Sequence, residues 1–190
     1  MTEPNQAVVD ELVREGESIG ERGMVERIER HHEGPGVAVE TVQAYAHELE
    51  AREDYAFDHR AFLADVAEDA IDAERWDGAK YYELDADGGS ERISLFPRAW
   101  HDRLGGSTDV ADYVEFVRAD EPGYLDDLER GGPGAGVPRQ AVIRALVLVG
   151  RVDRPTAETA VSEAVDRGDV VADTDLSPKA DLYLPGNAPE

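Results

Sequence analysis

The chain has 190 residues, 41% of them hydrophobic, and its 19 basic and 43 acidic side chains leave a formal net charge of −24. No apolar run is long enough to span a membrane, and the first residues lack the basic start and apolar stretch of a signal peptide, so we expect a cytoplasmic protein. Because there is no cysteine, disulfides, thiolate nucleophiles and cysteine-based metal sites are excluded.

The N-terminal part is predicted to be helical, because hydrophobic residues recur there at three- and four-residue spacings. Its first segment is either one helix or two helices joined near the sequence GERG at 20–23, where glycines weaken the middle. Asp58 is expected to be the N-cap of the last of these helices. The predicted helices span residues 7–32, 39–52 and 58–73.

A β-hairpin is predicted after these helices. Tyr81–Leu84 and Ile93–Phe96 are short β-prone runs, and a polar loop with two adjacent glycines separates them. Residues 98–130 are then expected to form a bridge that is rich in turns and contains a short helix near 109–118.

The C-terminal part begins with the most glycine-rich stretch of the chain, residues 131–137, which is predicted to be a linker. A helix follows, with Pro138 near its first turn. The next helix is predicted within RPTAETAVSEAVDRGD, with Pro155 at its first position, Arg154 before it and Gly168 at its end. A second hairpin is expected from two short apolar runs, Val170–Val171 and Leu182–Leu184.

The C-terminal segment resembles winged-helix domains, a class of helix-turn-helix fold. The matching features are a helix ending in LVGRVD, the helix RPTAETAVSEAVDRGDVV and the hairpin VVADTDLSPKADLYL. Helices followed by a hairpin also occur in the N-terminal half, so the resemblance implies an α+β, mostly helical protein with two winged-helix-like units joined by a bridge. A hairpin belonging to some other α+β domain remains the alternative. The expected divisions are residues 1–97, 98–130, 131–137 and 138–186.

The negative charge is concentrated in the N-terminal two thirds. Residues 1–132 carry 13 basic and 34 acidic residues, whereas 133–188 carry six and eight. An acid-rich chain with only two lysines resembles the cytoplasmic proteins of extreme halophiles. The general character of the sequence also resembles an uncharacterised family of halophilic archaeal proteins. An acidic surface built to bind a basic partner is the alternative explanation.

The implied function is a non-enzymatic regulator that binds DNA through its C-terminal unit, either weakly or as a homodimer. In a winged helix, the second helix of the helix-turn-helix enters the major groove. The acids Glu158, Glu163 and Asp166 on that helix oppose phosphate contact, so a protein-docking or dimerisation module without nucleic-acid contact is the alternative. The candidate DNA-binding residues are Arg154, Thr159, Ser162, Arg167 and Lys179.

No metal site, cofactor or catalytic residue is predicted. His31 and His32 are adjacent and cannot easily share one ion, and the sequence HELE at 47–50 lacks the second histidine of a zinc-protease helix. His59 and His101 are isolated in the sequence. Trp100, next to His101, is expected to anchor the bridge on the hydrophobic core rather than to mark a reaction site.

Overall fold

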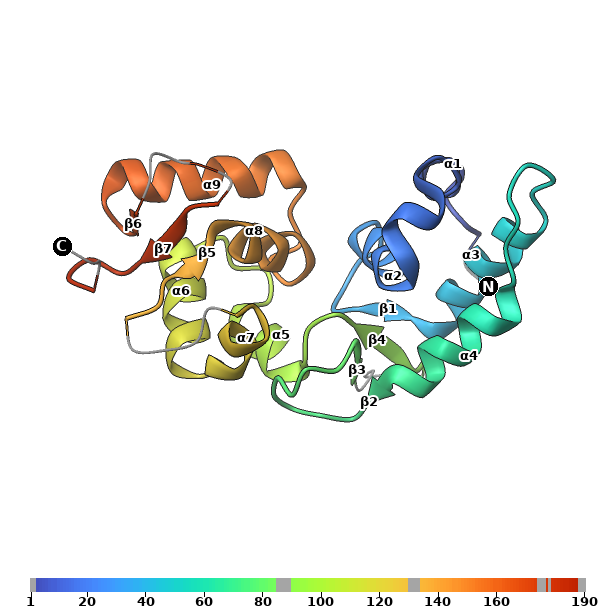
Figure 1. Ribbon diagram of the computed structural model, residues 1–190, viewed down its shortest axis with the longest axis horizontal. Helices are drawn as coiled ribbons and strands as arrows, with labels where there is room; N and C mark the ends of the chain where they lie inside the picture. Colours follow the sequence, from blue (N-terminus) through green and yellow to red (C-terminus); the bar gives the residue numbers. More distant parts are fainter. Residues whose placement is uncertain (1–2, 85–89, 130–133, 174–176, 178, 188–190) are drawn as a thin grey trace. The chain divides into compact units, whose positions relative to one another are not determined.

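The chain folds into two units, each built from helices and a small sheet (Figure 1). This computed structural model describes residues 3–84, 90–129, 134–173, 177 and 179–187. Over these residues the protein is α+β and mostly helical, as the sequence predicts, and none of their helices has both the length and the apolar composition needed to cross a membrane. The first unit comprises residues 1–74 and 79–98, and the second comprises 75–78 and 99–190.

The helices of the first unit are separated by capping residues and glycines. The Oδ1 atom of Asn5 accepts a hydrogen bond from the Ala7 N–H at 2.9 Å, which starts α1. Gly16, with a φ of +55°, ends α1, so the first segment forms two helices, with the break before GERG rather than within it. Asp58 caps α4, as predicted. The bounds are α1 Gln6–Glu15, the 3₁₀ helix η1 Gly16–Ile19, α2 Gly20–Arg30, α3 Val39–Glu50 and α4 His59–Asp69.

The first sheet has the strand order β1-β4-β3-β2. The predicted hairpin is confirmed, because β3 and β4 pair antiparallel with Glu83 opposite Ile93. The sequence did not predict β1, which pairs antiparallel with β4, or β2, which pairs parallel with β3 and begins where the third helix was expected to continue. The strands are β1 Val37–Ala38, β2 Ala70–Ile71, β3 Tyr81–Leu84 and β4 Arg92–Ser94.

The second unit is built around Trp100, which is fully buried, as expected for an anchor. Its ring packs edge-on against Phe116 and Tyr124, with centroids 5.3 and 5.0 Å away. Trp76 joins this cluster at 4.6 Å from Tyr124, which explains why residues 75–78 belong to the second unit. The helices are α5 Arg98–Leu104, α6 Val110–Ala119, α7 Pro122–Asp127, α8 Arg139–Leu148 and α9 Arg154–Arg167.

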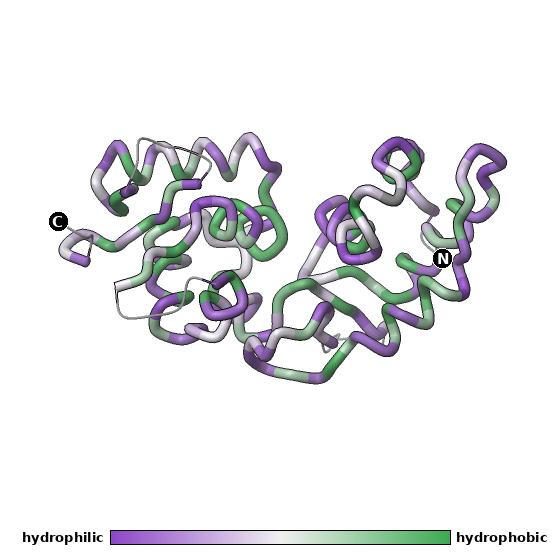
Figure 2. Tube along the Cα trace, viewed as in Figure 1, coloured by the Kyte–Doolittle hydropathy of each residue, from purple (hydrophilic) through white to green (hydrophobic). Residues whose placement is uncertain are grey.

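The second sheet has the strand order β5-β7-β6. The predicted C-terminal hairpin is confirmed, because β6 and β7 pair antiparallel with Val171 opposite Tyr183. β5 pairs antiparallel with β7 on its other side, placing Val137 opposite Leu182. The strands are β5 Val137–Pro138, β6 Val171–Ala172 and β7 Asp181–Tyr183. Figure 2 shows hydrophobic and hydrophilic residues alternating along the helices around these sheets, as expected for helices with one buried face.

The two units repeat one arrangement of elements. In each, a short strand leads directly into two helices, and a hairpin follows whose last strand pairs with the first. The first unit has one additional strand, β2, between its helices and its hairpin. The match extends to single hydrogen bonds, because the Val39 N–H donates to the Glu91 carbonyl and the Arg139 N–H donates to the Ala180 carbonyl, both at 2.9 Å. The sequence Gly-x-Gly-Val precedes the helices in both units, at 34–37 and at 134–137. The chain therefore contains a structural repeat about 100 residues apart.

Of the predicted bridge, residues 98–130, the described residues 99–129 lie in the same unit as the C-terminal segment, because α6 packs against both α8 and α9. Of the predicted linker, residues 131–133 lie outside the described residues. Gly134 to Gly136 lead directly into β5, which begins at Val137.

Candidate nucleic-acid interface and a histidine cluster

α9, the helix that carries four of the five predicted DNA-binding residues, has one buried side and one exposed side. Asp153 caps its start by accepting a hydrogen bond from the Thr156 N–H at 2.8 Å, and Gly168 ends it with a left-handed φ of +78°. The buried side consists of Ala157, Val161 and Ala164. Because these small side chains face α6 and α8, the polar residues of α9 face outward along its whole length.

The two arginines of α9 lie at opposite ends of the helix, and each is held by acidic or amide groups. Arg154 donates from Nε to Oε1 of Glu158 and from Nη2 to Oε1 of Gln140, both at 2.9 Å. Arg167 donates from Nε to Oδ2 of Asp169 at 2.8 Å. Both arginine side chains remain more than half exposed, and exposed ion pairs contribute at most about 1 kcal/mol, so a phosphate group can replace these carboxylates.

The two hydroxyl groups of the predicted interface are bonded back to their own helix. Thr159 donates to the Pro155 carbonyl at 2.9 Å, and Ser162 donates to the Glu158 carbonyl at 3.0 Å. A hydroxyl oxygen still has lone pairs to accept a further bond, and the group can rotate toward a new acceptor. These residues are therefore available to a ligand at the cost of a weak local hydrogen bond.

Lys179 lies between β6 and β7, on the segment that would be the wing. It is exposed, and its backbone N–H donates to Oγ of Ser177 at 3.2 Å. Nearby, Oδ1 of Asp173 accepts a hydrogen bond from the Asp181 N–H at 3.0 Å, which ties the two strands together. The structure thus places all five predicted residues in the second unit, four on α9 and one on the hairpin.

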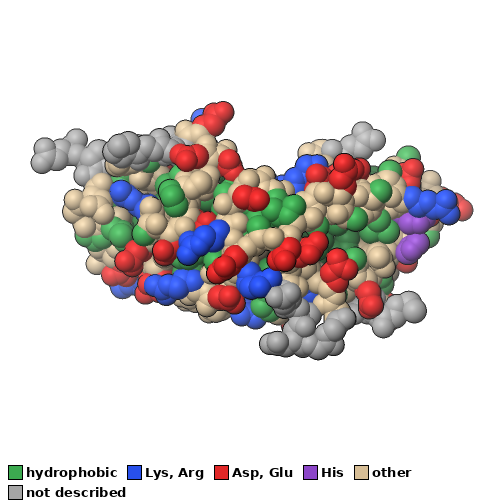
Figure 3. Space-filling view, turned by 90° about the horizontal axis from the view of Figure 1, so that it is seen from below, with side chains coloured by type: hydrophobic (Ala, Val, Ile, Leu, Met, Phe, Trp, Pro, Cys, Tyr) green, Lys and Arg blue, Asp and Glu red, His purple; other side chains and the backbone are tan. Residues whose placement is uncertain are grey.

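α4, the helix of the first unit that corresponds to α9, has an acidic environment. Burial and the neighbouring carboxylate of Asp65 raise the pKa of Glu21, on the adjacent α2. Lys80 donates to Oδ2 of Asp69 at 2.5 Å and so offsets part of this charge. The helix has no comparable set of basic residues, since Arg60 is its only Arg or Lys. On the face shown in Figure 3, acidic and basic side chains are interspersed.

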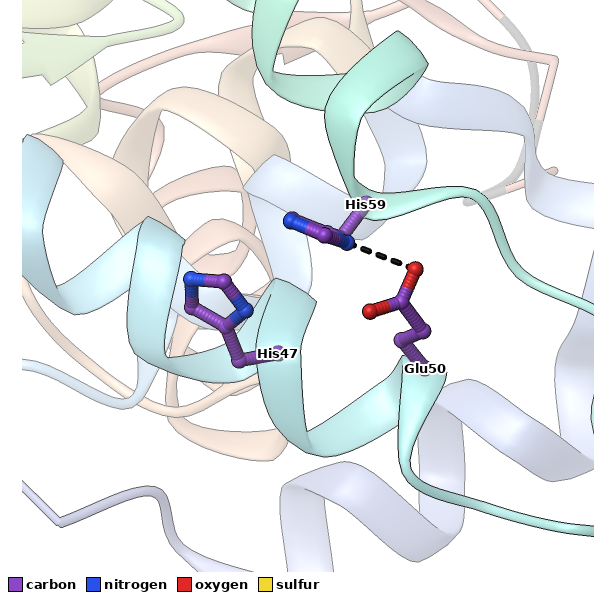
Figure 4. Close-up of side chains that lie close together, drawn as sticks. All are labelled: His47, Glu50 and His59. Atoms are coloured by element: carbon purple, nitrogen blue, oxygen red, sulfur yellow. Dashed lines mark ion pairs between the residues drawn. The ribbon is translucent and has the colours of Figure 1, made fainter.

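The first unit also brings together three residues that the sequence analysis treated as unrelated. His47 and Glu50 project from the last turns of α3, and His59 projects from the first residue of α4 (Figure 4). Nδ1 of His59 lies 2.6 Å from Oε1 of Glu50, and the centroids of the two imidazole rings are 4.4 Å apart. One ligand atom from each residue lies within 4.8 Å of the other two. The expectation that His59 is isolated is therefore wrong. The turn between α3 and α4 brings its side chain next to those of His47 and Glu50.

A hollow of about 250 Å³ lies in the first unit, between the η1–α2 region and the turn before α4. Its lining is mostly apolar, and Glu21 and Asp58 are the charged residues in it. Asp58 is occupied as the cap of α4, with its Oδ1 accepting from the N–H groups of Arg60 and Ala61 at 3.0 Å. The hollow suits an apolar group and lacks a nucleophile paired with a base. Its lining residues are Gly16, Gly20, Glu21, Met24, Tyr55, Ala56, Phe57, Asp58, Ala61 and Phe62.

Comparison with known proteins yields no match: no family model, no curated protein and no solved structure matches the chain.

Proposed function

We propose that the protein is a cytoplasmic, non-enzymatic regulator with two winged-helix-like units. The single observation that supports this most is the arrangement common to both units, a strand, two helices and a hairpin whose last strand pairs with the first. A winged helix has this order of elements, with its second helix exposed and its hairpin forming the wing. The resemblance noted in the C-terminal sequence points to the same class of fold.

In this proposal the second unit binds DNA, with α9 in the major groove and the β6–β7 hairpin against the backbone. The helix has 14 residues and is about 21 Å long at about 1.5 Å per residue, and a major groove accepts an α-helix. Arg154 and Arg167 at its two ends, with Lys179 on the hairpin, supply the phosphate contacts. Thr159 and Ser162 supply hydrogen bonds to base edges or phosphates.

A protein-docking or dimerisation role is the second candidate, and the charge of α9 favours it. Glu163 and Asp166 are exposed on the same side of the helix as the predicted contacts, and Glu158 is bonded to Arg154. Phosphate contacts dominate DNA affinity, so an acidic helix is a weak starting point for groove binding. A protein partner with basic residues would complement this surface without any rearrangement.

A fluorescence anisotropy titration with labelled duplex DNA over a series of KCl concentrations separates the two candidates. The triple variant Arg154→Ala, Arg167→Ala, Lys179→Ala should bind more weakly than wild type on all sequences, and its salt slope should fall by about one for each lost phosphate contact. The matched control is Arg14→Ala, Arg60→Ala, Lys80→Ala, which removes three exposed cations from the first unit and should bind like wild type. Equal losses in both variants, or no binding by wild type to any genomic fragment, would favour the docking role.

A further inference from the structure

Two helices hold His47, Glu50 and His59 in fixed positions. His47 and Glu50 are three residues apart on α3, a spacing that places both side chains on one face of the helix. His59 is the first residue of α4, directly after the capping residue Asp58. The two helices are packed together, with Leu49 and Phe62 buried. The three side chains therefore converge from rigid elements and not from a loop (Figure 4).

The ion pair between Glu50 and His59 does not account for His47. The His47 ring lies at the protein surface, with its plane at 43° to that of His59, and both rings present nitrogen atoms to the same small space as the Glu50 carboxylate. A cation between the side chains would use one lone pair from each ring and one from the carboxylate. The arrangement favours a shared positive ion over two separate histidines.

We propose that His47, Glu50 and His59 bind a divalent transition-metal ion, and that zinc fits the site best. Two imidazole nitrogens and one carboxylate oxygen are ligands that zinc accepts, whereas magnesium and calcium prefer oxygen ligands alone. Tetrahedral zinc, with bonds of about 2.0–2.2 Å, holds its ligand atoms roughly 3.4 Å apart. The ligand atoms here are within 4.8 Å, so small side-chain rotations complete the site.

Binding replaces the direct contact between Nδ1 of His59 and Oε1 of Glu50 with a bond from each atom to the metal ion, and any proton between them is released to solvent. The distance between these two atoms widens from 2.6 Å, and His47 moves toward them to supply the third bond. Water fills the fourth position, because His47 and Glu50 are exposed to solvent. The ion then joins the end of α3 to the start of α4 and stabilises the turn between them. This site is independent of the proposed DNA contact, which lies in the other unit.

The test is a titration of the full-length protein with Zn²⁺ by calorimetry, and with Co²⁺ by visible absorption, which reports tetrahedral nitrogen and oxygen ligation directly. Wild type should bind one equivalent of either ion, and zinc should raise the thermal unfolding midpoint. His47→Ala, His59→Ala and Glu50→Gln should each weaken the affinity by more than about tenfold. Because the ligands must lose protons to bind, the affinity should fall on acidification.

Matched controls use side chains of the same type elsewhere in the first unit. His31→Ala and Glu40→Gln change exposed residues outside the cluster and should bind zinc like wild type. Circular dichroism checks that each variant is folded, which is expected because His47 and Glu50 are exposed. Absence of a one-to-one complex, or equal affinity in wild type and all three cluster variants, would overturn the proposal.

Discussion

Glu29 is a carboxylic acid buried inside the first unit. It lies on α2 and is 3% exposed, in the middle of the first unit. Its carboxylate accepts hydrogen bonds from the Ser94 hydroxyl at 2.5 Å and from the Leu95 N–H at 3.1 Å. These bonds connect α2 to the end of β4, but they do not fully replace water, and burial raises the pKa of Glu29 to about 7.

The raised pKa of Glu29 makes the stability of the first unit depend on pH. The folded form keeps its proton up to about pH 7, whereas the unfolded chain releases it near the ordinary glutamate pKa of 4.5. Between these values the folded state binds more protons, so the free energy of unfolding falls as the pH rises. The full loss is about 3 kcal/mol above pH 7, at about 1.4 kcal/mol per pKa unit.

We expect Glu29→Gln to remove this dependence, because the amide stays neutral and can still bond to Ser94 and Leu95. Urea unfolding at pH 4.5, 6 and 8 measures the free energy of unfolding of both proteins. The value for the variant should rise relative to wild type as the pH increases, by up to about 3 kcal/mol at pH 8. Glu40→Gln, an exposed change on α3, is the control for the titration of the other carboxylates. A difference between the Glu29 variant and wild type that does not change with pH would contradict the assigned pKa.

Several single-residue features could be predicted from the sequence and others could not. The cap at Asp58 and the left-handed Gly168 follow from local rules, because the bonds involved lie within a few residues. Glu29 gave no such signal, since its partners are 65 and 66 residues away. His59 is 12 residues from His47, and only the turn between two helices brings them together. Contacts that depend on tertiary folding were therefore the ones missed.

At the scale of elements, the same short strand was missed in both units. β1 and β5 each have two residues, too few for an alternating pattern, and each leads into a helix that the sequence does predict. The repeated Gly-x-Gly-Val was the available signal. A Cβ atom on Gly36 would lie 2.4 Å from the Ile93 carbonyl oxygen, and one on Gly136 would lie 2.6 Å from the Tyr183 ring. In both units a glycine is required where the first strand meets the last.

The close approach at Gly136 predicts that Gly136→Ala destabilises the second unit. Its Cβ atom would also lie 2.7 Å from Cβ of Asp181, so β7 would have to move away from β5. Overpacking of this kind costs about 1–3 kcal/mol, measurable by denaturant unfolding. Gly123→Ala is the matched control in the same unit, because its Cβ atom would make ordinary contacts at 3.9 Å or more and should be near neutral. If the two variants are equally stable, the strand pairing described here is wrong.

At the scale of the whole molecule, the net charge of −24 sets the conditions under which any DNA contact can form. Such a charge opposes approach to DNA unless salt screens it, and the Debye length falls to about 3 Å at molar salt. High salt also weakens the phosphate contacts themselves. In the proposed complex, affinity would then depend on short-range contacts at α9, where each arginine must be released from a neighbouring carboxylate.

The most direct test of the proposed DNA-binding surface is therefore to remove those carboxylates. Glu158→Gln, Asp169→Asn takes away the acid bonded to Arg154 and the acid bonded to Arg167 at 2.8 Å. In an anisotropy titration across a KCl series, we expect this variant to bind duplex DNA more tightly than wild type, by roughly tenfold at low salt. Glu40→Gln, Glu68→Gln, which removes the same charge from the first unit, should change affinity far less. Equal affinities for the two double variants, or no binding by either, would contradict the assignment of α9 as the helix that contacts DNA.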